Sequence, residues 1–439
     1  MKLNDIIRKI TAVFLCAAVT AASAVSAPAA PKFESAEAAA ENITVGWNLG
    51  NTLDSCGEWI GLYTEGKPEN YETAWGNPAA SRELIAAVKA AGFNAVRVPV
   101  TWAEHIDEKG SINAEWLDRV QEVVDYVISQ DLYCILNVHH DAGSDGWLEA
   151  SADCFGKYSG KFAGLWNNIA VRFREYGDKL IFEGFNEILD SQNSWSDARE
   201  SDAYKAVNDF NQLFVDTVRA TGGNNAERNL MVQVYSGSCS EMALEGFVLP
   251  SDSTLGHLMI QVHNYDPQGF TSSGATWTTM TDKWGSDAEK QYFDRMFDRL
   301  ESFAKEQGAP LVIGEFGAEY KGNEPSRELY AEYFVTGAAD RGIKCFWWDT
   351  GDMALFDRST CTVKYPGIVK ALTKNTSHAQ QPVLGDADGS GAVNALDAAV
   401  ILKYSVGIAV HLNTAAADYN GDGAVNALDA ADILKWIVA

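Results

Sequence analysis

Short apolar runs alternate with amphipathic segments along most of the chain, beginning near residue 43. The apolar runs are typical of strands that are covered on both faces, as the strands of a parallel sheet are. Eight such runs follow one another: ITVGWNLGN, NAVRVPV, YCILNVHH, LIFEGFNE, NLMVQVY, LMIQVHNY, PLVIGEFG and KCFWWDT. Strand and helix repeated eight times predict a (β/α)8 TIM barrel, which is an α/β fold.

The segments between the strands carry apolar residues at helical spacing. We expect helices over residues 82–92, 114–129, 160–177, 202–220, 287–307 and 327–342, with a weaker one near Cys239. Gly92 is suited to end the first of these helices. A doubly wound open sheet is the alternative. It requires a glycine-rich phosphate loop that opens a helix after the first strand, and GWNLGNTLD does not do so.

Polar side chains gather near the carboxyl ends of the expected strands. They are Arg97, His139, His140, Asn186, Glu187, His263, Tyr265, Glu315, Trp348 and Asp349. Solvation of strand ends explains one or two of these residues, but it does not explain why six strands end in such polar side chains. The active sites of barrel enzymes form on this rim. Glu187 and Glu315 supply the two carboxyl groups that cleavage of a glycosidic bond by a general acid and a nucleophile requires.

The overall charge limits the possible partners. The 439 residues include 60 acidic and 34 basic side chains, for a formal net charge of −26. A surface that binds nucleic acid or an anionic membrane needs a basic patch, so neither is expected as a partner. At the N-terminus, basic residues, an apolar stretch and then small residues predict a signal peptide over residues 1–27, with cleavage after Ala24 or Ala27 and secretion as the outcome. A retained membrane anchor is the alternative.

Six cysteines remain outside the signal peptide, namely Cys56, Cys134, Cys154, Cys239, Cys345 and Cys361. Their spacing is wide and includes no CxxC motif. Cys134 and Cys345 fall inside expected core strands, where a free thiol packs as a small hydrophobe. We expect at most one or two disulfides and no catalytic cysteine.

A polar stretch without periodicity, residues 374–383, predicts a linker between a catalytic domain over residues 41–373 and a small domain over residues 384–439. The small domain contains an internal repeat, because GDADGSGAVNALDAAVILK and ADYNGDGAVNALDAADILK align with Asp386 on Asp418, a period of 418 − 386 = 32 residues. It is therefore a duplicated unit.

Each repeat places oxygen ligands at the loop positions that a calcium ion requires, with a glycine at position six for the sharp turn. The expected metal ligands, including the backbone carbonyls of the two alanines, are Asp386, Asp388, Ser390, Ala392, Asn394, Asp397, Asp418, Asn420, Asp422, Ala424, Asn426 and Asp429. A helix follows each loop but none precedes it, with Ile401, Leu402, Ile433 and Leu434 on the apolar sides of the following helices.

This all-α arrangement of duplicated calcium loop and helix resembles the type I dockerin modules of cellulosomal enzymes. The resemblance implies Ca²⁺-dependent folding and a cohesin domain of a scaffoldin as partner. Ala395 and Leu396, repeated as Ala427 and Leu428, occupy the positions that tune the choice of cohesin. Because the copies are alike, two opposite binding orientations are possible. Ser390 departs from the usual Asp or Asn and would weaken the first calcium site, and Ala-Leu is not the familiar Ser-Thr pair, so the particular cohesin stays open.

The blocks at the strand ends resemble, in order, glycoside hydrolase family five and its endoglucanase-rich subfamily. They are GWNLGNTLD, NAVRVPVTW, ILNVHHD, FEGFNE, VHNYDPQGF, VIGEFG and FWWDTG. The resemblance implies Glu187 as the acid/base, Glu315 as the nucleophile, retention of anomeric configuration, and no cofactor for catalysis.

The same resemblance assigns roles to the remaining rim residues. Arg97 and Tyr265 would donate to Glu315, Asn186 would bind the sugar 2-hydroxyl, and His263 would support Glu187 or the sugar. Trp348 would stack under the ring, and His139 and His140 would complete the substrate-binding set. Glu183 is separated from Glu187 by an even number of positions, so both side chains should point to the same face of the strand. Glu183 would then project into the barrel, where it needs a basic partner.

Two alternatives concern the chemistry. A metal site at His139, His140 and Asp141 is disfavoured if consecutive strand residues point to opposite faces. Several tryptophans follow the expected strands and would line a polysaccharide groove, although each singly is as easily a core residue: Trp59, Trp75, Trp102, Trp147, Trp195, Trp277 and Trp284.

We therefore expect a secreted, monomeric endo-β-1,4-glucanase that cleaves cellulose or a related β-glucan. Cleavage of xyloglucan, mixed-linkage glucan (as by a lichenase), mannan or xylan by the same glutamates is one alternative, and a non-catalytic carbohydrate-binding protein is another.

Overall fold

The computed structural model describes residues 33–143, 146–374, 384–388, 393–408, 410, 412, 414–421 and 423–438. The expected signal peptide, nearly all of the expected linker, and the ligands Ser390, Ala392 and Asp422 lie outside these residues.

Eight parallel strands close into a barrel in sequence order, from β1 beside β2 round to β8 beside β1. They are β1 Gly46–Asn48, β2 Ala95–Val98, β3 Tyr133–Asn137, β4 Leu180–Glu183, β5 Leu230–Gln233, β6 Leu258–His263, β7 Leu311–Phe316 and β8 Lys344–Trp348. Each lies within one of the eight runs identified from the apolar pattern, so the predicted TIM barrel is confirmed.

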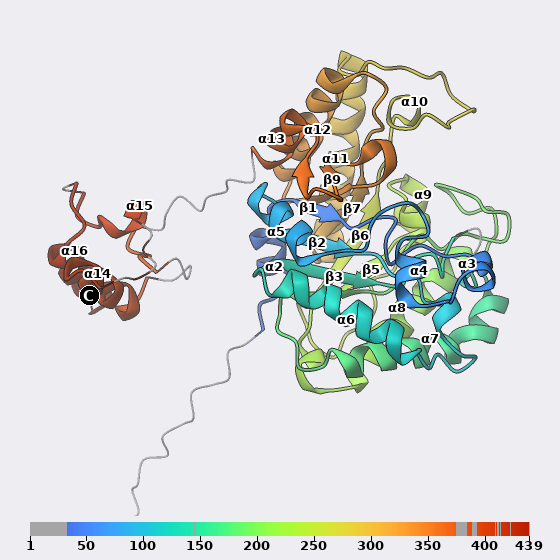
Figure 1. Ribbon diagram of the computed structural model, residues 1–439, viewed down its shortest axis with the longest axis horizontal. Helices are drawn as coiled ribbons and strands as arrows, with labels where there is room; N and C mark the ends of the chain where they lie inside the picture. Colours follow the sequence, from blue (N-terminus) through green and yellow to red (C-terminus); the bar gives the residue numbers. More distant parts are fainter. Residues whose placement is uncertain are drawn as a thin grey trace, which may run out of the picture. The chain divides into compact units, whose positions relative to one another are not determined.

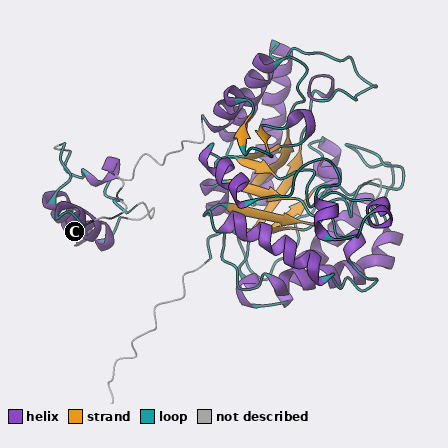
Figure 2. Ribbon diagram, viewed as in Figure 1, coloured by secondary structure: helices purple, strands orange, loops and turns teal. Residues whose placement is uncertain are grey.

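Helices surround the strands, as Figure 2 shows by the purple ribbons around the orange ones. The longer ones, labelled in Figure 1, are α5 Arg82–Ala90, α6 Ala114–Ile128, α7 Ala152–Arg172, α8 Ala203–Ala220, α11 Asp287–Gln307, α12 Glu324–Ala339 and α13 Pro366–Thr373. Shorter ones, α3 Glu58–Tyr63, α4 Pro68–Glu72, α9 Glu241–Gly246 and α10 Gln268–Thr271, lie in the loops that follow β1, β5 and β6. Gly92 follows α5 with a φ of +106°, as its expected role in ending that helix requires.

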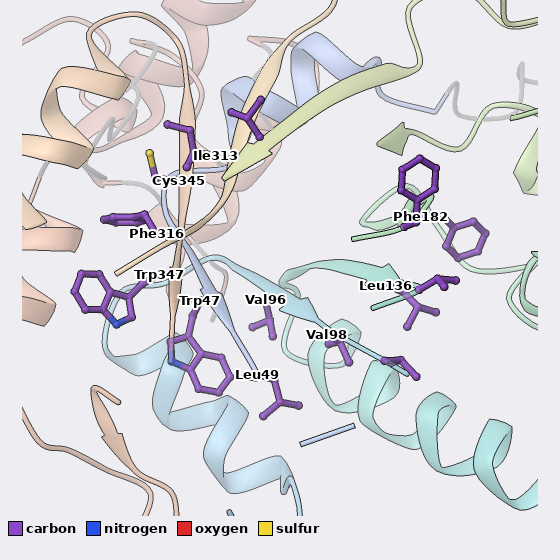
Figure 3. Close-up of a cluster of buried hydrophobic side chains, with 14 of the residues drawn as sticks. Trp47, Leu49, Val96, Val98, Leu136, Phe182, Ile313, Phe316, Cys345 and Trp347 are labelled. Carbon is purple, nitrogen blue, oxygen red and sulfur yellow. The ribbon is translucent and has the colours of Figure 1, made fainter. Parts of the chain in front are cut away.

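The hydrophobic core lies mainly between the strands and the helices. Outward-facing side chains of successive strands, such as Trp47, Val96, Leu136, Phe182 and Ile313, pack there and are fully buried (Figure 3). This layer accounts for the apolar half of each strand, because alternate residues of a strand point to opposite faces. The other half points into the barrel.

The inside of the barrel is apolar at its amino-terminal end. Ile135, Met231, Met259 and Phe346 belong to one buried cluster there, and helix α2, Ala36–Asn42, adds its alanines to the same cluster. The side chain of Ser35 caps α2 by accepting a hydrogen bond from the backbone N–H of Ala38. The packed structure therefore starts before residue 41, the expected boundary, because this alanine-rich helix closes the floor of the barrel.

All six cysteines of the described chain are free thiols, with Cys134 and Cys345 buried in β3 and β8 as expected. Within the part of the chain that the structure describes, no helix combines the length and the apolar character needed to cross a membrane.

The C-terminal unit contains helices α14 Ala395–Ser405, α15 Thr414–Ala417 and α16 Ala427–Val438. Ile401 and Ile433 occupy equivalent places in its core and are fully buried. Leu402 and Leu434, expected on the same apolar sides, are instead 42% and 40% exposed. The short α15 was also not expected, since it precedes the second loop.

Candidate active site

Glu187 and Glu315, which are 128 positions apart (315 − 187) in the chain, lie together at the carboxyl ends of the strands. Glu187 is in the loop after β4, and Glu315 is near the end of β7. One carboxylate oxygen of each residue and one ring nitrogen of His263 lie within 4.8 Å of one another. Both carboxyl groups can therefore reach the same bond of a bound substrate.

A β-bulge turns Glu315 toward the barrel. The ladder between β6 and β7 pairs Val262 with Ile313 but His263 with Glu315, so Gly314 is an extra residue in β7. Without this extra residue, Glu315 would share the outward face of Ile313 because strand residues alternate.

Arg97 of β2 is the centre of a buried hydrogen-bond network. Its Nε and Nη2 donate to the two carboxylate oxygens of Glu183 at 2.6 and 2.7 Å, and its Nη1 donates to Oε1 of Glu315 at 2.6 Å. The remaining contacts go to Asn48 and Asn186, at 3.0 and 2.8 Å. Arg97 is therefore the basic partner that Glu183 needs. It has no exposed surface, and its expected donation to Glu315 is present. Arg97 holds the carboxylates of Glu183 and Glu315 through these hydrogen bonds.

The environment of Glu315 favours the ionised form. Burial alone would raise the pKa of Glu315, but the charges of His263 and Arg97 and the hydrogen bonds from Arg97 and Tyr265 bring this pKa below its usual value. The Tyr265 hydroxyl donates to Oε2 at 2.8 Å. A carboxyl group that keeps its charge while buried is suited to nucleophilic attack.

Glu187 has a different surrounding. It is 18% exposed by its side chain, and its Oε1 lies 2.7 Å from Nδ1 of His263. None of the hydrogen bonds found in the described chain joins it to a guanidinium or an ammonium group. The expected contact of His263 with Glu187 is thus present.

His139 approaches Glu315, and the rings of His140 and Trp348 lie against the ring of His139. His139 Nε2 is 4.0 Å from Oε1 of Glu315, and its ring stacks on Trp348 with centroids 5.6 Å apart and planes 9° apart. The ring of His140 lies beside that of His139, at 4.5 Å, and beside that of Trp75, at 5.3 Å. Rings therefore extend from the carboxylates toward the loop after β1.

The proposed alternative of a metal at His139, His140 and Asp141 does not fit. Asp141 instead accepts hydrogen bonds from the backbone N–H of Trp102 and from the indole of Trp147. The argument from strand alternation is wrong, however, because β3 ends at Asn137 and both histidines lie beyond it.

Both histidines do approach Asp54, which puts a ligand atom from each of the three within 4.8 Å. The hydrogen bonds of Asn137, beside His139, argue against a metal at that place. Asn137 accepts the Val100 N–H at its Oδ1, which points its Nδ2 at Nδ1 of His139, 3.0 Å away. The hydrogen of His139 is then on Nε2, so the ring offers no lone pair to a metal on that side.

The aromatic residues expected in a groove fall into three groups by exposure: exposed, half-buried and buried. Trp195 and Trp277, which are 57% and 73% exposed, line a cavity of about 830 Å³ together with Glu187, His263 and Tyr265. Trp59 is also exposed, whereas Trp75 and Trp147 are half-buried. Trp102 and Trp284 are buried core residues.

The sequence did not identify three members of the network, namely Asn48, Asn137 and Gln261. Each points into the barrel from the carboxyl-terminal half of its strand and is fully buried. Their polar character in otherwise apolar runs was the available signal.

In the C-terminal unit, carboxylate oxygens of Asp386, Asp388 and Asp397 converge within 4.8 Å. Asp397 also accepts hydrogen bonds from the backbone N–H groups of Asp388 and Asn394. Asp429 repeats this pattern with Asn420 and Asn426. Clustered carboxylates with oxygen neighbours fit a hard cation such as Ca²⁺.

Comparisons with known proteins agree with this division of the chain. The family model "Cellulase (glycosyl hydrolase family 5)" matches residues 54–354, and "Dockerin type I domain" matches residues 384–436. Endoglucanase A of Clostridium longisporum is 37% identical over 355 residues, which cover 79% of this chain and 66% of that protein. Endoglucanase B of Clostridium cellulovorans is 35% identical over 383 residues, which cover 84% of this chain and 82% of that protein.

Solved structures give the same result. A "GH5-4 broad specificity endoglucanase" of Ruminococcus champanellensis with bound cellotriose has a TM-score of 0.72 and 37% identity, over 78% of this chain and 99% of that one. A family 5 enzyme of Prevotella bryantii in complex with a xyloglucan tetradecasaccharide has a TM-score of 0.71 and 34% identity, over 78% of this chain and 99% of that one. The chain is therefore a glycoside hydrolase that belongs to glycosyl hydrolase family 5, with a type I dockerin domain after its endoglucanase barrel.

Proposed function

We propose that this chain is a secreted, retaining endo-β-1,4-glucanase that is attached to a cellulosome scaffold by its dockerin domain. Glu315 is the nucleophile and Glu187 is the acid/base. The observation that carries this proposal is the approach of one carboxylate oxygen of each glutamate within 4.8 Å, with Glu187 on the wall of a cavity. Retaining enzymes hold the two groups about 5 to 5.5 Å apart, whereas inverting enzymes need about 6.5 to 9.5 Å to admit a water molecule.

The two glutamates divide the chemistry. In the first step a Glu315 oxygen attacks the anomeric carbon as the glycosidic C–O bond breaks, and Glu187 gives its proton to the leaving oxygen. In the second step Glu187 takes a proton from water as that water displaces Glu315 from the sugar. Two inversions give net retention. Arg97 and Tyr265 stabilise the charge on Glu315 before the attack, since both donate to its oxygens.

The sugar on each side of the broken bond has its own set of contacts. Trp348, His139 and His140 bind the sugar that becomes attached to Glu315, with Asn186 at its 2-hydroxyl. The departing chain lies in the cavity beside Glu187, where Trp195 and Trp277 offer exposed rings for stacking.

Two glutamate variants test the assignment. Glu315→Ala should abolish hydrolysis, and azide should restore turnover of an activated β-cellobioside to give the α-glycosyl azide. Glu187→Ala with azide should give the β-glycosyl azide. Glu301→Gln, in α11, is the control for a lost carboxylate. Wild-type hydrolysis by folded Glu315→Ala would refute the assignment.

The preferred polymer is the second part of the proposal. We propose cellulose or a related β-1,4-glucan, and the cavity of about 830 Å³ beside Glu187 also favours a branched glucan such as xyloglucan. Release of reducing sugar from carboxymethylcellulose, xyloglucan, mixed-linkage glucan, mannan and xylan distinguishes these substrates. Inactivity on all five would instead indicate a carbohydrate-binding protein.

The proposed domains are a signal peptide over residues 1–27, the barrel, a linker over residues 374–383 and the dockerin over residues 384–439. Ca²⁺ held by the paired loops stabilises the dockerin fold, and a cohesin is the partner. Leu396 and Leu428 support the two proposed binding orientations, because they are equivalent in the repeat and similarly exposed, at 65% and 61%.

A further inference from the structure

Gln261 contacts the histidine that supports Glu187. It lies on β6, two residues before His263, and it is fully buried in the barrel. Its side-chain Nε2 is 3.0 Å from Nε2 of His263. Its Oε1 is buried without a hydrogen-bond partner in the described chain. The amide is therefore held mainly through its contact with the histidine.

Gly314 provides the room for this amide. A Cβ atom built on Gly314 would lie 2.4 to 2.6 Å from the carbon, nitrogen and oxygen of the Gln261 amide. Gly314 is the extra residue of the bulge that also turns Glu315 inward. The same backbone feature thus serves the nucleophile and the neighbour of His263.

The arrangement selects one form of the His263 ring. An amide N–H directed at Nε2 requires a lone pair on that nitrogen, so the ring hydrogen is on Nδ1, which faces Glu187. We propose that Gln261 is a positioning residue for the acid/base: its amide holds His263 as the neutral ring that donates from Nδ1 to Glu187. This inference rests on the proposed acid role of Glu187.

The charges around His263 show why such a constraint matters. Glu187 and Glu315 face Nδ1, at 2.7 and 3.9 Å. Other charged or titratable neighbours include Arg97, His139 and Cys239, whose thiol donates to the backbone carbonyl of His263. Burial lowers the pKa of His263, but the two carboxylates outweigh burial and raise it. A second proton would go to Nε2, where the amide N–H stands. A charged His263 would favour the ionised form of Glu187 and remove the proton that the leaving oxygen needs.

Gln261→Glu tests the proposal with almost no change of shape. An ionised carboxylate only accepts hydrogen bonds, so it favours a proton on Nε2. Gln233→Glu is the matched control, because Gln233 pairs with Gln261 in the ladder between β5 and β6 and is also fully buried. No hydrogen bond found in the described chain joins Gln233 to His263.

Two substrates separate acid catalysis from general damage. Phenyl β-cellobioside needs a proton on its leaving oxygen, whereas dinitrophenyl β-cellobioside does not. In Gln261→Glu at neutral pH we expect kcat/KM for the phenyl substrate to fall about tenfold, with the dinitrophenyl value within about twofold of wild type. The basic limb of the phenyl pH profile should move to lower pH by about one unit. Gln233→Glu should show neither effect.

An equal loss on both substrates, or the same shift in Gln233→Glu, would overturn the proposal. Glu187→Gln distinguishes the two levels of inference. If it shows no difference between the substrates, the acid role itself fails. If it shows the difference and Gln261→Glu does not, only the role of Gln261 fails. Imidazole ¹⁵N NMR of the wild-type chain, assigned with His263→Asn, requires no folded Gln261 variant. Hydrogen on Nε2 in the neutral ring would also refute the proposal.

Discussion

Tyr265→Phe removes one hydrogen bond from the nucleophile and leaves the aromatic ring in place. The Tyr265 hydroxyl donates to Oε2 of Glu315 at 2.8 Å, while Arg97 continues to donate to Oε1. A hydrogen bond to a charged group contributes about 1.5 to 3 kcal/mol. One pKa unit corresponds to about 1.4 kcal/mol, so the loss should raise the pKa of Glu315 by about one to two units. Water that reaches the vacated oxygen would bring the rise toward the lower figure.

The direction of the effect on activity follows from the ionised state that attack requires. Glu315 has a pKa below its usual value, and Tyr265→Phe raises that pKa. The acid limb of kcat/KM for dinitrophenyl β-cellobioside should therefore move to higher pH by about one unit. Tyr292→Phe is the control, because Tyr292 lines the same cavity but its hydroxyl bonds to Asp266. If Tyr265→Phe lowers activity equally at all pH values, Tyr265 positions substrate and does not tune Glu315.

The same shift in pKa affects stability. A carboxyl group whose pKa is lower in the folded state stabilises the protein above its unfolded-state pKa, and this contribution disappears as the pH falls through the folded-state value. Tyr265→Phe should therefore lower the free energy of unfolding at neutral pH and have a smaller effect in acid. Urea denaturation at several pH values measures the difference, and an effect that grows in acid would contradict the sign.

Two further predictions concern the scaffold and the dockerin. Gly164→Ala should lower the free energy of unfolding by more than about 2 kcal/mol, because its Cβ would lie 1.9 Å from the Lys109 carbonyl oxygen. Gly156→Ala in the same helix meets nothing within 4 Å and should raise that free energy by about 0.5 to 1 kcal/mol; equal urea midpoints would contradict this. Removal of Ca²⁺ by a chelator should abolish cohesin binding and reduce helicity, with hydrolysis of soluble glucan unchanged. Parallel loss of hydrolysis would show that the barrel also depends on the metal.

Much of the barrel and its rim follows from the order of strands and polar residues. Parallel strands bring all their carboxyl ends to one edge, so residues far apart in sequence, such as Glu187 and Glu315, must share that edge once the barrel closes. The contacts of Tyr265 with Glu315 and of His263 with Glu187, which the family resemblance implied, are present. Topology therefore predicts which strand ends meet at the rim.

Several features depend on packing that a sequence pattern does not contain. Period-two alternation would turn Glu315 outward, and only the bulge at Gly314 corrects its direction. The long side chain of Arg97 reaches both Glu183 and Glu315, so its partners could not be chosen from strand parity alone. Helix α2 closes the barrel floor with three buried alanines, a signal too weak to separate from a linker.

The total charge of the buried groups stays the same through the proposed reaction. Arg97 remains paired with Glu183, at 2.6 and 2.7 Å, while the reaction proceeds at the other two glutamates. When Glu315 becomes a neutral ester, Glu187 has just lost its proton, so one negative charge moves from one glutamate to the other. His263 lies between them, with Nδ1 at 2.7 Å from Glu187 and 3.9 Å from Glu315. Its N–H can therefore stabilise the charge at either position, and no compensating ion has to enter the buried site.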